Sequence, residues 1–489
     1  MKMKILRAPF FLLLLPVFFV LHGFQENAEF IGYGDFLLLL FIYCGAAVVL
    51  YAVVYFFFRQ PAGAAILTFY LLSGYLFFGF IQDACKSYLP FLSRYIVLLP
   101  LFLTGFVLLC WYVVSKRNNQ FPRLRLLLNL LLVVYIFIDM GKLLLNWPGN
   151  SKKDGGSTGM AAAITYKRCV DCPTPDIYFL LFDAYTGSRS LKKRYQFNNE
   201  GLDSFLLKKG FSIQYNSRSN YFFTAFSMAS ILNMSYLSKI PDEKAVTVDD
   251  YNRCTNLVKN NLVTDFMSEQ GYKIINYSVF DLPGNPTPVN ETFLPLKTRL
   301  ITASTLLPRM QKDLGWIWAG NTLFKTRENN EKLLNSVKEE SRRSSVRPRF
   351  VYAHIYLPHA PFYYNRNGQL RNEEDLIRKS RGFSLPGYLD YLPYTNSKVK
   401  DLIQTIFENT GGKAVIVFMG DHGFNNDVTA VDSVYTFQNQ NAVYFPGKDY
   451  HLLYDSITGV NQFRVLFNQL FKQHFPLLRD SVIILKDKK

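Results

Sequence analysis

Residues 1–145 form nearly continuous apolar runs, and this feature limits the fold of the chain more than any other. A helix of about 20 apolar residues is long enough to cross a bilayer. The first run follows a short basic segment, as in a signal peptide, but no clear small-x-small cleavage site is present and further spans follow, so we expect a retained helix. We therefore predict five membrane-spanning helices, at Leu6–Val20, Phe36–Phe58, Ala62–Ile81, Tyr95–Val114 and Leu124–Leu145.

Basic residues are concentrated on one side of these predicted helices. Because loops rich in Lys and Arg stay in the cytoplasm, we expect a cytoplasmic N-terminus and an extracytoplasmic chain after the fifth helix. The formal net charge of +17 also suits contact with anionic headgroups or substrates. No Arg-rich or RNP-like element indicates nucleic acid binding. The residues that decide the orientation are Lys2, Lys4 and Arg7 before the first helix, Arg59 after the second, and Lys116, Arg117, Arg123 and Arg125 after the fourth.

The composition of the chain changes after the last apolar run. Residues 146–175 contain a stretch rich in Gly, Ser and Lys, and we expect a linker or interfacial segment there. Within residues 176–489, short β-branched runs alternate with amphipathic segments, such as a predicted helix at Ser397–Gly412 before the apolar run KAVIVF. This alternation predicts one α/β domain with a mostly parallel sheet.

The end of KAVIVF carries the strongest functional signal, the sequence Met419-Gly420-Asp421-His422-Gly423. Functional groups in open α/β sheets lie just beyond the carboxyl ends of the parallel strands. A carboxylate and an imidazole at this place can both bind one hard or borderline cation. The alternative is an ordinary turn after a strand, and Asp421 and His422 alone do not decide between the two.

Two other predicted strands also end at polar side chains. Asp183 follows the buried run IYFLLF and is expected at the same sheet edge as Asp421, unless it only forms a turn or caps a helix. His359 lies beyond the strand RFVYAHIYL, where it could bind a phosphoryl oxygen or transfer a proton. His354 lies within that strand, and we expect it to be a buried residue that supports the site.

Thr224 precedes an apolar segment, Phe226–Leu237, whose periodicity predicts a helix. Thr is a common N-cap residue, so a purely structural role would explain it. The same position places the hydroxyl group at the positive end of the helix, where backbone N–H groups stabilise an alkoxide or a phosphate ester. Beside a divalent cation the hydroxyl group loses its proton more readily, which makes Thr224 a candidate nucleophile.

The cysteines indicate an oxidising compartment for the second part of the chain. Cys85, Cys169, Cys172 and Cys254 fall on the predicted extracytoplasmic side, where disulfides persist. The pair Cys169-Val-Asp-Cys172 could be a redox pair, a metal-binding pair or a structural disulfide. A structural role is favoured, because no second CxxC completes a zinc site and no thioredoxin pattern surrounds the pair.

Four motifs follow one another along the chain, at Asp183, Thr224, His359 and Asp421-His422. With these motifs in this order, the chain resembles the alkaline phosphatase/sulfatase superfamily. Within it, the chain is most similar to the membrane-bound phosphoethanolamine and phosphoglycerol transferases, including lipoteichoic-acid synthases, which have five N-terminal transmembrane helices and an extracytoplasmic alkaline-phosphatase-like α/β sandwich domain. The resemblance implies that Thr224, in the sequence TAFS with Ser227, is the nucleophile, and that His359, in LPHAPF, is a second catalytic residue. It implies one divalent ion, Zn²⁺ or Mn²⁺, held by Asp183, Thr224, Asp421 and His422.

The implied activity is transfer of a phosphoethanolamine or phosphoglycerol group from a membrane phospholipid to a cell-envelope glycan or glycolipid through a phosphothreonine intermediate. The implied location is the inner (cytoplasmic) membrane, with a multi-pass anchor and the catalytic domain on the extracytoplasmic, periplasmic side. Two features depart from the family. No C/S-x-P/A-x-R sequence precedes a helix, so we do not expect sulfate ester cleavage, and no His follows Asp-His-Gly before His451. The alternatives are a membrane-tethered phosphodiesterase or phosphatase and a catalytically inactive binding protein.

Overall fold

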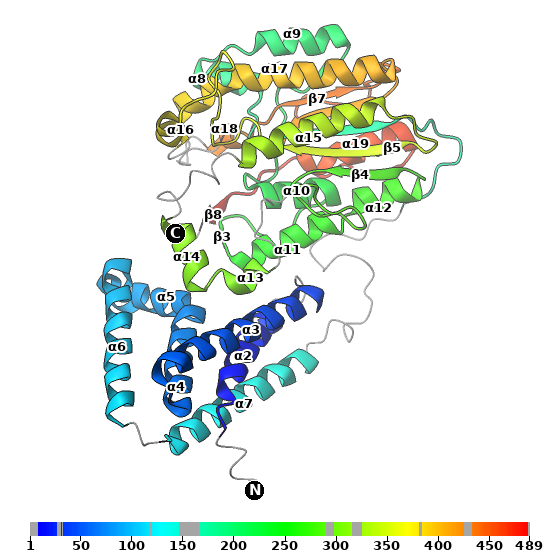
Figure 1. The fold of residues 1–489 in the computed structure, drawn as a ribbon. Helices are drawn as coiled ribbons and strands as arrows, with labels where there is room; N and C mark the ends of the chain where they lie inside the picture. Colours follow the sequence, from blue (N-terminus) through cyan, green and yellow to red (C-terminus); the bar gives the residue numbers. More distant parts are fainter. Residues whose placement is uncertain are drawn as a thin grey trace. The chain divides into compact units, whose positions relative to one another are not determined.

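The computed structural model describes residues 8–26, 31, 33–116, 120–145, 166–289, 298–314, 325–380, 384–424 and 433–487. The chain separates into two compact units (Figure 1). The first unit contains residues 1–154 and 295–319, and the second contains residues 155–294 and 320–489. Residues 298–314 therefore fold with the N-terminal helices although they interrupt the sequence of the second unit. The predicted domains, 1–145, 146–175 and 176–489, do not contain this excursion.

The first unit is built from apolar helices. Among the described residues, α3, α6 and α7 are long and apolar enough to cross a membrane, and α4 with α5 adds a fourth span if the bent pair is counted as one. Helix α2 has 16 residues, a length of about 24 Å, whereas the apolar core of a bilayer is about 30 Å thick. The apolar helices indicate a membrane anchor, but the predicted count of five spans is not confirmed. The first predicted span begins at Leu6 and Arg7, which lie outside the described residues. The bounds are α2 (Phe11–Glu26), α3 (Tyr33–Phe58), α4 (Pro61–Leu76), α5 (Phe78–Tyr88), the 3₁₀ helix η1 (Pro90–Ser93), α6 (Tyr95–Ser115) and α7 (Pro122–Leu145).

The third predicted span, Ala62–Ile81, is divided between two helices. Helices α4 and α5 meet at Phe77 and are bent by 58°. The bend lies beside the turn between α13 (Arg299–Thr302) and α14 (Leu306–Leu314), where the N–H group of Gly79 donates a 2.7 Å hydrogen bond to the carbonyl oxygen of Ser304. A Cβ atom at Gly79 would lie only 2.6 Å from this oxygen, so the contact requires glycine. A distant segment of the chain therefore occupies the site of the bend, which the local sequence does not reveal.

The second unit contains a six-stranded sheet with the order β2-β7-β6-β1-β5-β4. Strands β6, β1, β5 and β4 are parallel. At one edge, β7 pairs antiparallel with β6, and β2 pairs antiparallel with β7. This arrangement confirms the predicted mixed α/β fold with a mostly parallel sheet. Two further strands, β3 and β8, pair in a small parallel sheet. The bounds are β1 (Ile177–Phe182), β2 (Ser212–Ile213), β3 (Lys244–Val246), β4 (Lys273–Tyr277), β5 (Arg349–Ile355), β6 (Val415–Gly420), β7 (Asn441–Tyr444) and β8 (Leu485–Asp487).

Helices cover both faces of the six-stranded sheet (Figure 1). One face is covered by α10, α12 and α19, and the other by α9, α15 and α17. The strand interiors are fully buried, which explains why the sequence shows unbroken apolar runs rather than alternation. The remaining helices are short and flank these layers. The bounds are α8 (Ser188–Tyr195), α9 (Glu200–Lys209), α10 (Thr224–Asn233), α11 (Val248–Lys259), α12 (Leu262–Glu269), α15 (Lys325–Arg342), α16 (Glu373–Ser380), α17 (Leu385–Thr410), α18 (Ser433–Phe437) and α19 (Gly459–Phe471).

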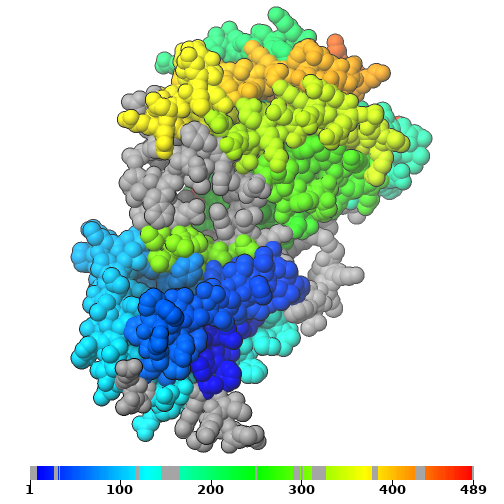
Figure 2. Space-filling model, in the orientation of Figure 1, coloured from blue at the N-terminus to red at the C-terminus, as the bar shows by residue number. Residues whose placement is uncertain are grey.

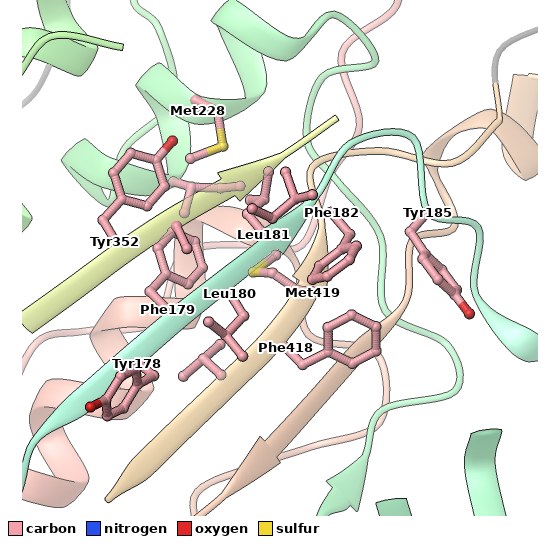
Figure 3. Close-up of a cluster of buried hydrophobic side chains, with 14 of the residues drawn as sticks. Tyr178, Phe179, Leu180, Leu181, Phe182, Tyr185, Met228, Tyr352, Phe418 and Met419 are labelled. Carbon is pink, nitrogen blue, oxygen red and sulfur yellow. The ribbon is translucent and has the colours of Figure 1, made fainter. Parts of the chain in front are cut away.

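The side chains of β1 show which helices share a face with the site. Phe179 stacks on Tyr352 of β5 and contacts Phe463 of α19 edge-on at 5.0 Å between ring centroids. Met228 of α10 lies on the same side as Tyr352 (Figure 3). Because side chains alternate along a strand, Asp183 points to the same face as Phe179. The register of the sheet thus directs this carboxylate toward α10.

The pair Cys169 and Cys172 forms a disulfide, in agreement with the structural role that we favoured. Cys85 and Cys254 are free thiols. Cys254 is completely buried in the second unit, and burial raises the pKa of its thiol. It is therefore an inert core residue.

Candidate active site

Three polar side chains meet where β1 and β6 end. Phe182, the last residue of β1, pairs with Ile355 of β5 on one side and with Gly420 of β6 on the other. Asp183 and Asp421 each follow directly after these paired positions, so the sheet register brings the two carboxylates together. Ligand atoms of Asp183, Asp421 and His422 all lie within 4.8 Å of one another, and all three residues are buried.

The hydrogen bonds of the two carboxylates leave oxygens available for a cation. Oδ1 of Asp421 accepts hydrogen bonds from the backbone N–H groups of Ala184 at 2.8 Å and His422 at 2.9 Å. Within the described part of the chain, Oδ2 of Asp421 and both carboxylate oxygens of Asp183 have no hydrogen-bond partner, although they are buried. Buried carboxylate oxygens without partners are costly unless a cation compensates their charge. The residues present therefore fit a divalent metal ion.

The backbone of Ala184 is strained at this site. Its φ angle is +59°, in the left-handed region that residues with a Cβ atom rarely adopt. This conformation costs roughly 1–2 kcal/mol. In return the backbone N–H group of Ala184 reaches Oδ1 of Asp421 and orients that carboxylate. Backbone strain of this kind is concentrated at functional sites.

The imidazole of His422 is oriented by the chain that follows it. Its Nδ1 lies 2.7 Å from the carbonyl oxygen of Gly423, which can only accept a hydrogen bond, so Nδ1 carries the proton. The lone pair of Nε2 therefore faces the site. Nε2 lies 3.3 Å from Oδ2 of Asp421 and 3.3 Å from Oγ1 of Thr224. This is the tautomer that a metal-binding histidine requires.

Thr224 does not act as the cap of its helix. It is the first residue of α10, the N-cap position is occupied by Phe223, and no side chain caps this end. Thr224 is only 3% exposed and its hydroxyl group faces His422. One turn later, Oγ of Ser227 donates a 2.7 Å hydrogen bond to the carbonyl oxygen of Asp421 and ties α10 to the loop after β6.

Two histidines of the β5 segment complete the surroundings. His354 is fully buried, as we expected, and its Nε2 lies 3.6 Å from Oδ2 of Asp183. Its Nδ1 lies 3.1 Å from the hydroxyl oxygen of Tyr352, a residue whose part in the site the sequence analysis missed. The two-residue spacing of Tyr352 and His354 on a strand was the available signal, since it puts them on one face. His359 is partly exposed, and its Nδ1 lies 2.6 Å from the carbonyl oxygen of Ala360.

The two carboxyl groups of the site have opposite pKa shifts. Burial alone would raise the pKa of Asp183, but the imidazoles of His359, His354 and His422 lower it below its ordinary value. Burial and the charge of Asp183 raise the pKa of Asp421, and the neighbouring histidines offset only part of this rise. Without a cation, Asp183 is therefore ionised while Asp421 keeps its proton to a higher pH than usual.

The family model described as sulfatase matches residues 260–473. No curated protein matches the chain significantly. Among solved structures, the C-terminal periplasmic domain of EcEptC from Escherichia coli is 13% identical over 65% of this chain and 90% of its own, with a TM-score of 0.40. The corresponding domain of the phosphoethanolamine transferase EptC from Campylobacter jejuni is 15% identical over 62% of this chain and 92% of its own, with a TM-score of 0.37. The phosphonate monoester hydrolase of Agrobacterium radiobacter is 12% identical over 60% and 73%, with a TM-score of 0.37.

The matched residues include β5 and β6 and the loops that follow them. His354, His359, Asp421 and His422 all lie within this range. Asp183 and Thr224 lie before it and join the site through β1 and α10. Residues 260–473, which carry four of these residues of the site, thus match the sulfatase family.

Proposed function

We propose that this protein transfers a phosphoethanolamine or phosphoglycerol group from a membrane phospholipid to a hydroxyl group of a cell-envelope glycan or glycolipid. The observation that carries the proposal is the buried hydroxyl group of Thr224, which caps no helix and lies 3.3 Å from Nε2 of His422, beside carboxylate oxygens without partners. A hydroxyl group in this position is placed to be a nucleophile. The apolar helices of the first unit would keep the site near the lipid donor, at the extracytoplasmic face of the inner (cytoplasmic) membrane.

A divalent ion, Zn²⁺ or Mn²⁺, would be held by Asp183, Asp421, His422 and the Thr224 oxygen, where it would lower the pKa of the Thr224 hydroxyl group and offset the charge of the phosphoryl oxygens. The structure of the chain itself also stabilises negative charge at the nucleophile. Thr224 begins α10, so the positive end of the helix dipole lies at the nucleophile and favours negative charge there. The burial of Asp183 and Asp421 excludes water, which strengthens these electrostatic interactions.

The proposed reaction has two steps. In the first, the oxygen Oγ1 of Thr224, whose proton has already passed to solvent, forms a bond to phosphorus, the bond from phosphorus to the diacylglycerol oxygen breaks, and this oxygen takes a proton from His359. In the second, His359 takes the proton of the acceptor hydroxyl group, whose oxygen attacks phosphorus and displaces Thr224. His359 suits this role because it is partly exposed and its Nδ1 is directed to the Ala360 carbonyl oxygen, which orients the imidazole ring.

The proposal is tested by the intact mass of the full chain after incubation with phosphatidylethanolamine or phosphatidylglycerol in detergent and divalent metal. We expect the mass to increase by one phosphoethanolamine or one phosphoglycerol group. The Thr224→Ala variant should show no increase. Thr395→Ala, which removes a different buried threonine hydroxyl group from α17, should label like the wild type.

The acceptor is tested by diacylglycerol release with and without added glycan or glycolipid. Release that depends on the acceptor supports the transferase. Equal release in both conditions would instead assign a hydrolase that uses water. Absence of both labelling and release in metal-loaded protein with either lipid would contradict the proposal and favour a binding protein.

A further inference from the structure

Helix α5 exposes an apolar stripe although its opposite face is packed inside the first unit. Phe80, Ile81 and Tyr88 are 52%, 40% and 84% exposed, whereas Phe78 and Gln82 are only 3% and 2% exposed. The three exposed residues lie on one side of the helix, because they are separated by one, seven and eight positions. A stripe of large apolar side chains on one face and buried residues on the other is not the pattern of a helix that solvent surrounds.

Exposed apolar residues also follow α5 in the segment that leads to α6. Leu89, Phe91 of η1 and Ile96 at the start of α6 are 59%, 64% and 82% exposed. An exposed apolar surface of this extent marks a contact with a membrane or with another protein. We call Phe80, Ile81, Tyr88, Leu89, Phe91 and Ile96 the α5 surface.

The position of the α5 surface in the chain decides which partner it fits. It lies between α4 and α6, which are the two neighbouring apolar helices of the anchor. The basic loops predict that α4 begins, and α6 ends, at the cytoplasmic side. The connection between them is therefore expected at the extracytoplasmic surface of the bilayer. The 58° bend turns α5 away from the direction of α4, as an interfacial helix requires.

Contacts within the first unit fix the rotation of α5. The backbone of Gly79 is bonded to Ser304, and the guanidinium of Arg309 on α14 pairs with Asp83 and also reaches the carbonyl oxygen of Gly79 at 3.4 Å. Figure 2 shows the yellow-green side chains of α13 and α14 against the pale blue side chains of the first unit. Because α14 holds one side of α5, the helix cannot turn its apolar stripe inward.

We propose that the α5 surface is an interfacial lipid-binding surface whose occupant is the phospholipid of the extracytoplasmic leaflet. The apolar side chains insert among the acyl chains at the level just below the headgroups. Lys86 and Arg94, which are both exposed, contact the lipid phosphates. The surface is independent of the chemistry at Thr224, so the test below can fail while the proposed transferase activity stands.

The test places an environment-sensitive fluorophore on the α5 surface of the full chain. Tyr88→Cys and Phe91→Cys are labelled with NBD in a background in which Cys44, Cys85, Cys110 and Cys254 are serine, and the Cys169–Cys172 disulfide is kept. The labelled protein is reconstituted into phosphatidylcholine/phosphatidylglycerol vesicles whose acyl chains are brominated near the headgroup or near the bilayer centre. Val346→Cys, on a fully exposed loop of the second unit, is the aqueous control, and Phe41→Cys on α3, which is 80% exposed, is the lipid-facing control.

We expect blue-shifted emission at positions 88 and 91 and a larger loss of emission with shallow than with deep bromines. Position 41 should be quenched by bromine at some depth and position 346 by neither. Emission typical of water without quenching at positions 88 and 91 would overturn the proposal. Blue-shifted emission without quenching at either depth would also overturn it, because a protein surface, such as the catalytic domain, would then cover the α5 surface.

The proposed contact of Lys86 and Arg94 with lipid phosphates is tested by the double variant Lys86→Gln, Arg94→Gln. In the parent protein, quenching at position 88 by shallow bromines should increase with the fraction of phosphatidylglycerol in the vesicles. In the double variant this increase should be lost while quenching in phosphatidylcholine remains. An unchanged dependence of quenching on phosphatidylglycerol would show that Lys86 and Arg94 do not contact the lipid phosphates.

Discussion

Oγ1 of Thr224 lies 3.3 Å from Nε2 of His422, although 198 residues separate them in the sequence. One side chain begins a helix on one face of the sheet and the other follows the strand β6. The contact distinguishes the two explanations for Thr224, because a threonine that caps its own helix would direct its oxygen to the backbone of the first turn. The hydroxyl group is instead directed to the residues that could hold a metal ion.

Ser227→Ala should lower both the stability of the protein and its turnover. The substitution removes the 2.7 Å hydrogen bond to the carbonyl oxygen of Asp421 and leaves that buried acceptor unpaired, at a cost of about 1–3 kcal/mol. The loop that carries Asp421 and His422 also loses its link to Thr224, and we expect turnover to fall roughly 10- to 100-fold. Diacylglycerol release and thermal unfolding measure the two effects.

Ser230→Ala is the matched control for this variant. Ser230 lies three positions further along α10, is equally buried, and donates to the carbonyl oxygen of Ser235 at 2.9 Å. We expect similar destabilisation but nearly unchanged turnover. Equal loss of turnover in both variants would show that Ser227 acts only through the stability of α10.

His354→Ala should weaken metal binding. The imidazole bridges Tyr352 and Asp183, so its removal leaves the Asp183 carboxylate without its neighbour at 3.6 Å. Groups that orient a metal ligand typically contribute 10- to 100-fold to metal affinity. Competition with a metal-binding dye measures the change. His451→Ala, which removes an exposed histidine paired with Asp449, should leave the affinity unchanged, and an equal loss in both variants would argue against a role for His354.

The buried strands and the residues at their ends could be predicted from the sequence. An unbroken apolar run such as IYFLLF is typical of a strand that is buried on both faces of a parallel sheet. The carboxyl ends of parallel strands necessarily lie at the same edge of the sheet. The expectation that Asp183 and Asp421 lie together follows from these two facts alone. The close placement of Thr224 required the register and the order of the strands, which the sequence pattern does not contain.

Other features depended on contacts between distant residues. Helix α17 begins at Leu385 rather than Ser397, and it continues through Pro393, a residue that ordinarily interrupts a helix. The N-cap of this helix is Ser384, whose side chain accepts a hydrogen bond from the N–H group of Gly387. The apolar periodicity of the sequence does not identify Ser384 as the start of the helix. The bend between α4 and α5 depends on Ser304, more than 200 positions away. Local propensity cannot encode such contacts.

Asp421→Asn should stabilise the metal-free protein at neutral pH. Burial and the charge of Asp183 raise the pKa of Asp421, so ionising this group in the folded state costs stability at every pH above its unfolded pKa. Asparagine removes this cost and keeps an oxygen that can accept from the Ala184 N–H group. The increase in Tm should shrink as the pH falls below the folded pKa of Asp421 and disappear near the lower pKa of the unfolded state, where Asp421 is protonated in both states.

The thermal transition can be followed by a thiol-reactive dye in a background where Cys44, Cys85 and Cys110 are serine. The dye reaches the buried Cys254 only when the second unit unfolds. Addition of Zn²⁺ or Mn²⁺ should raise the Tm of the wild type but not that of Asp421→Asn. The metal-induced increase should shrink at acidic pH, because the metal then competes with a proton on Asp421. A lower Tm for the metal-free variant at neutral pH would contradict this account.

Reversing the charges of Asp83 and Arg309 should test how residues 298–314 are held to α5. Asp83→Arg and Arg309→Asp each place like charges together, whereas the double variant restores an opposite pair. Because Asp83 is largely exposed, the coupling between the two residues should be modest, about 0.2–1 kcal/mol. Cys85, half-buried two positions from Asp83, provides a local readout when the other free cysteines are serine. We expect faster thiol labelling of Cys85 in each single variant and a rate near that of the parent in the double variant; a rate that stays elevated in the double variant would show that the charge pair does not hold this contact.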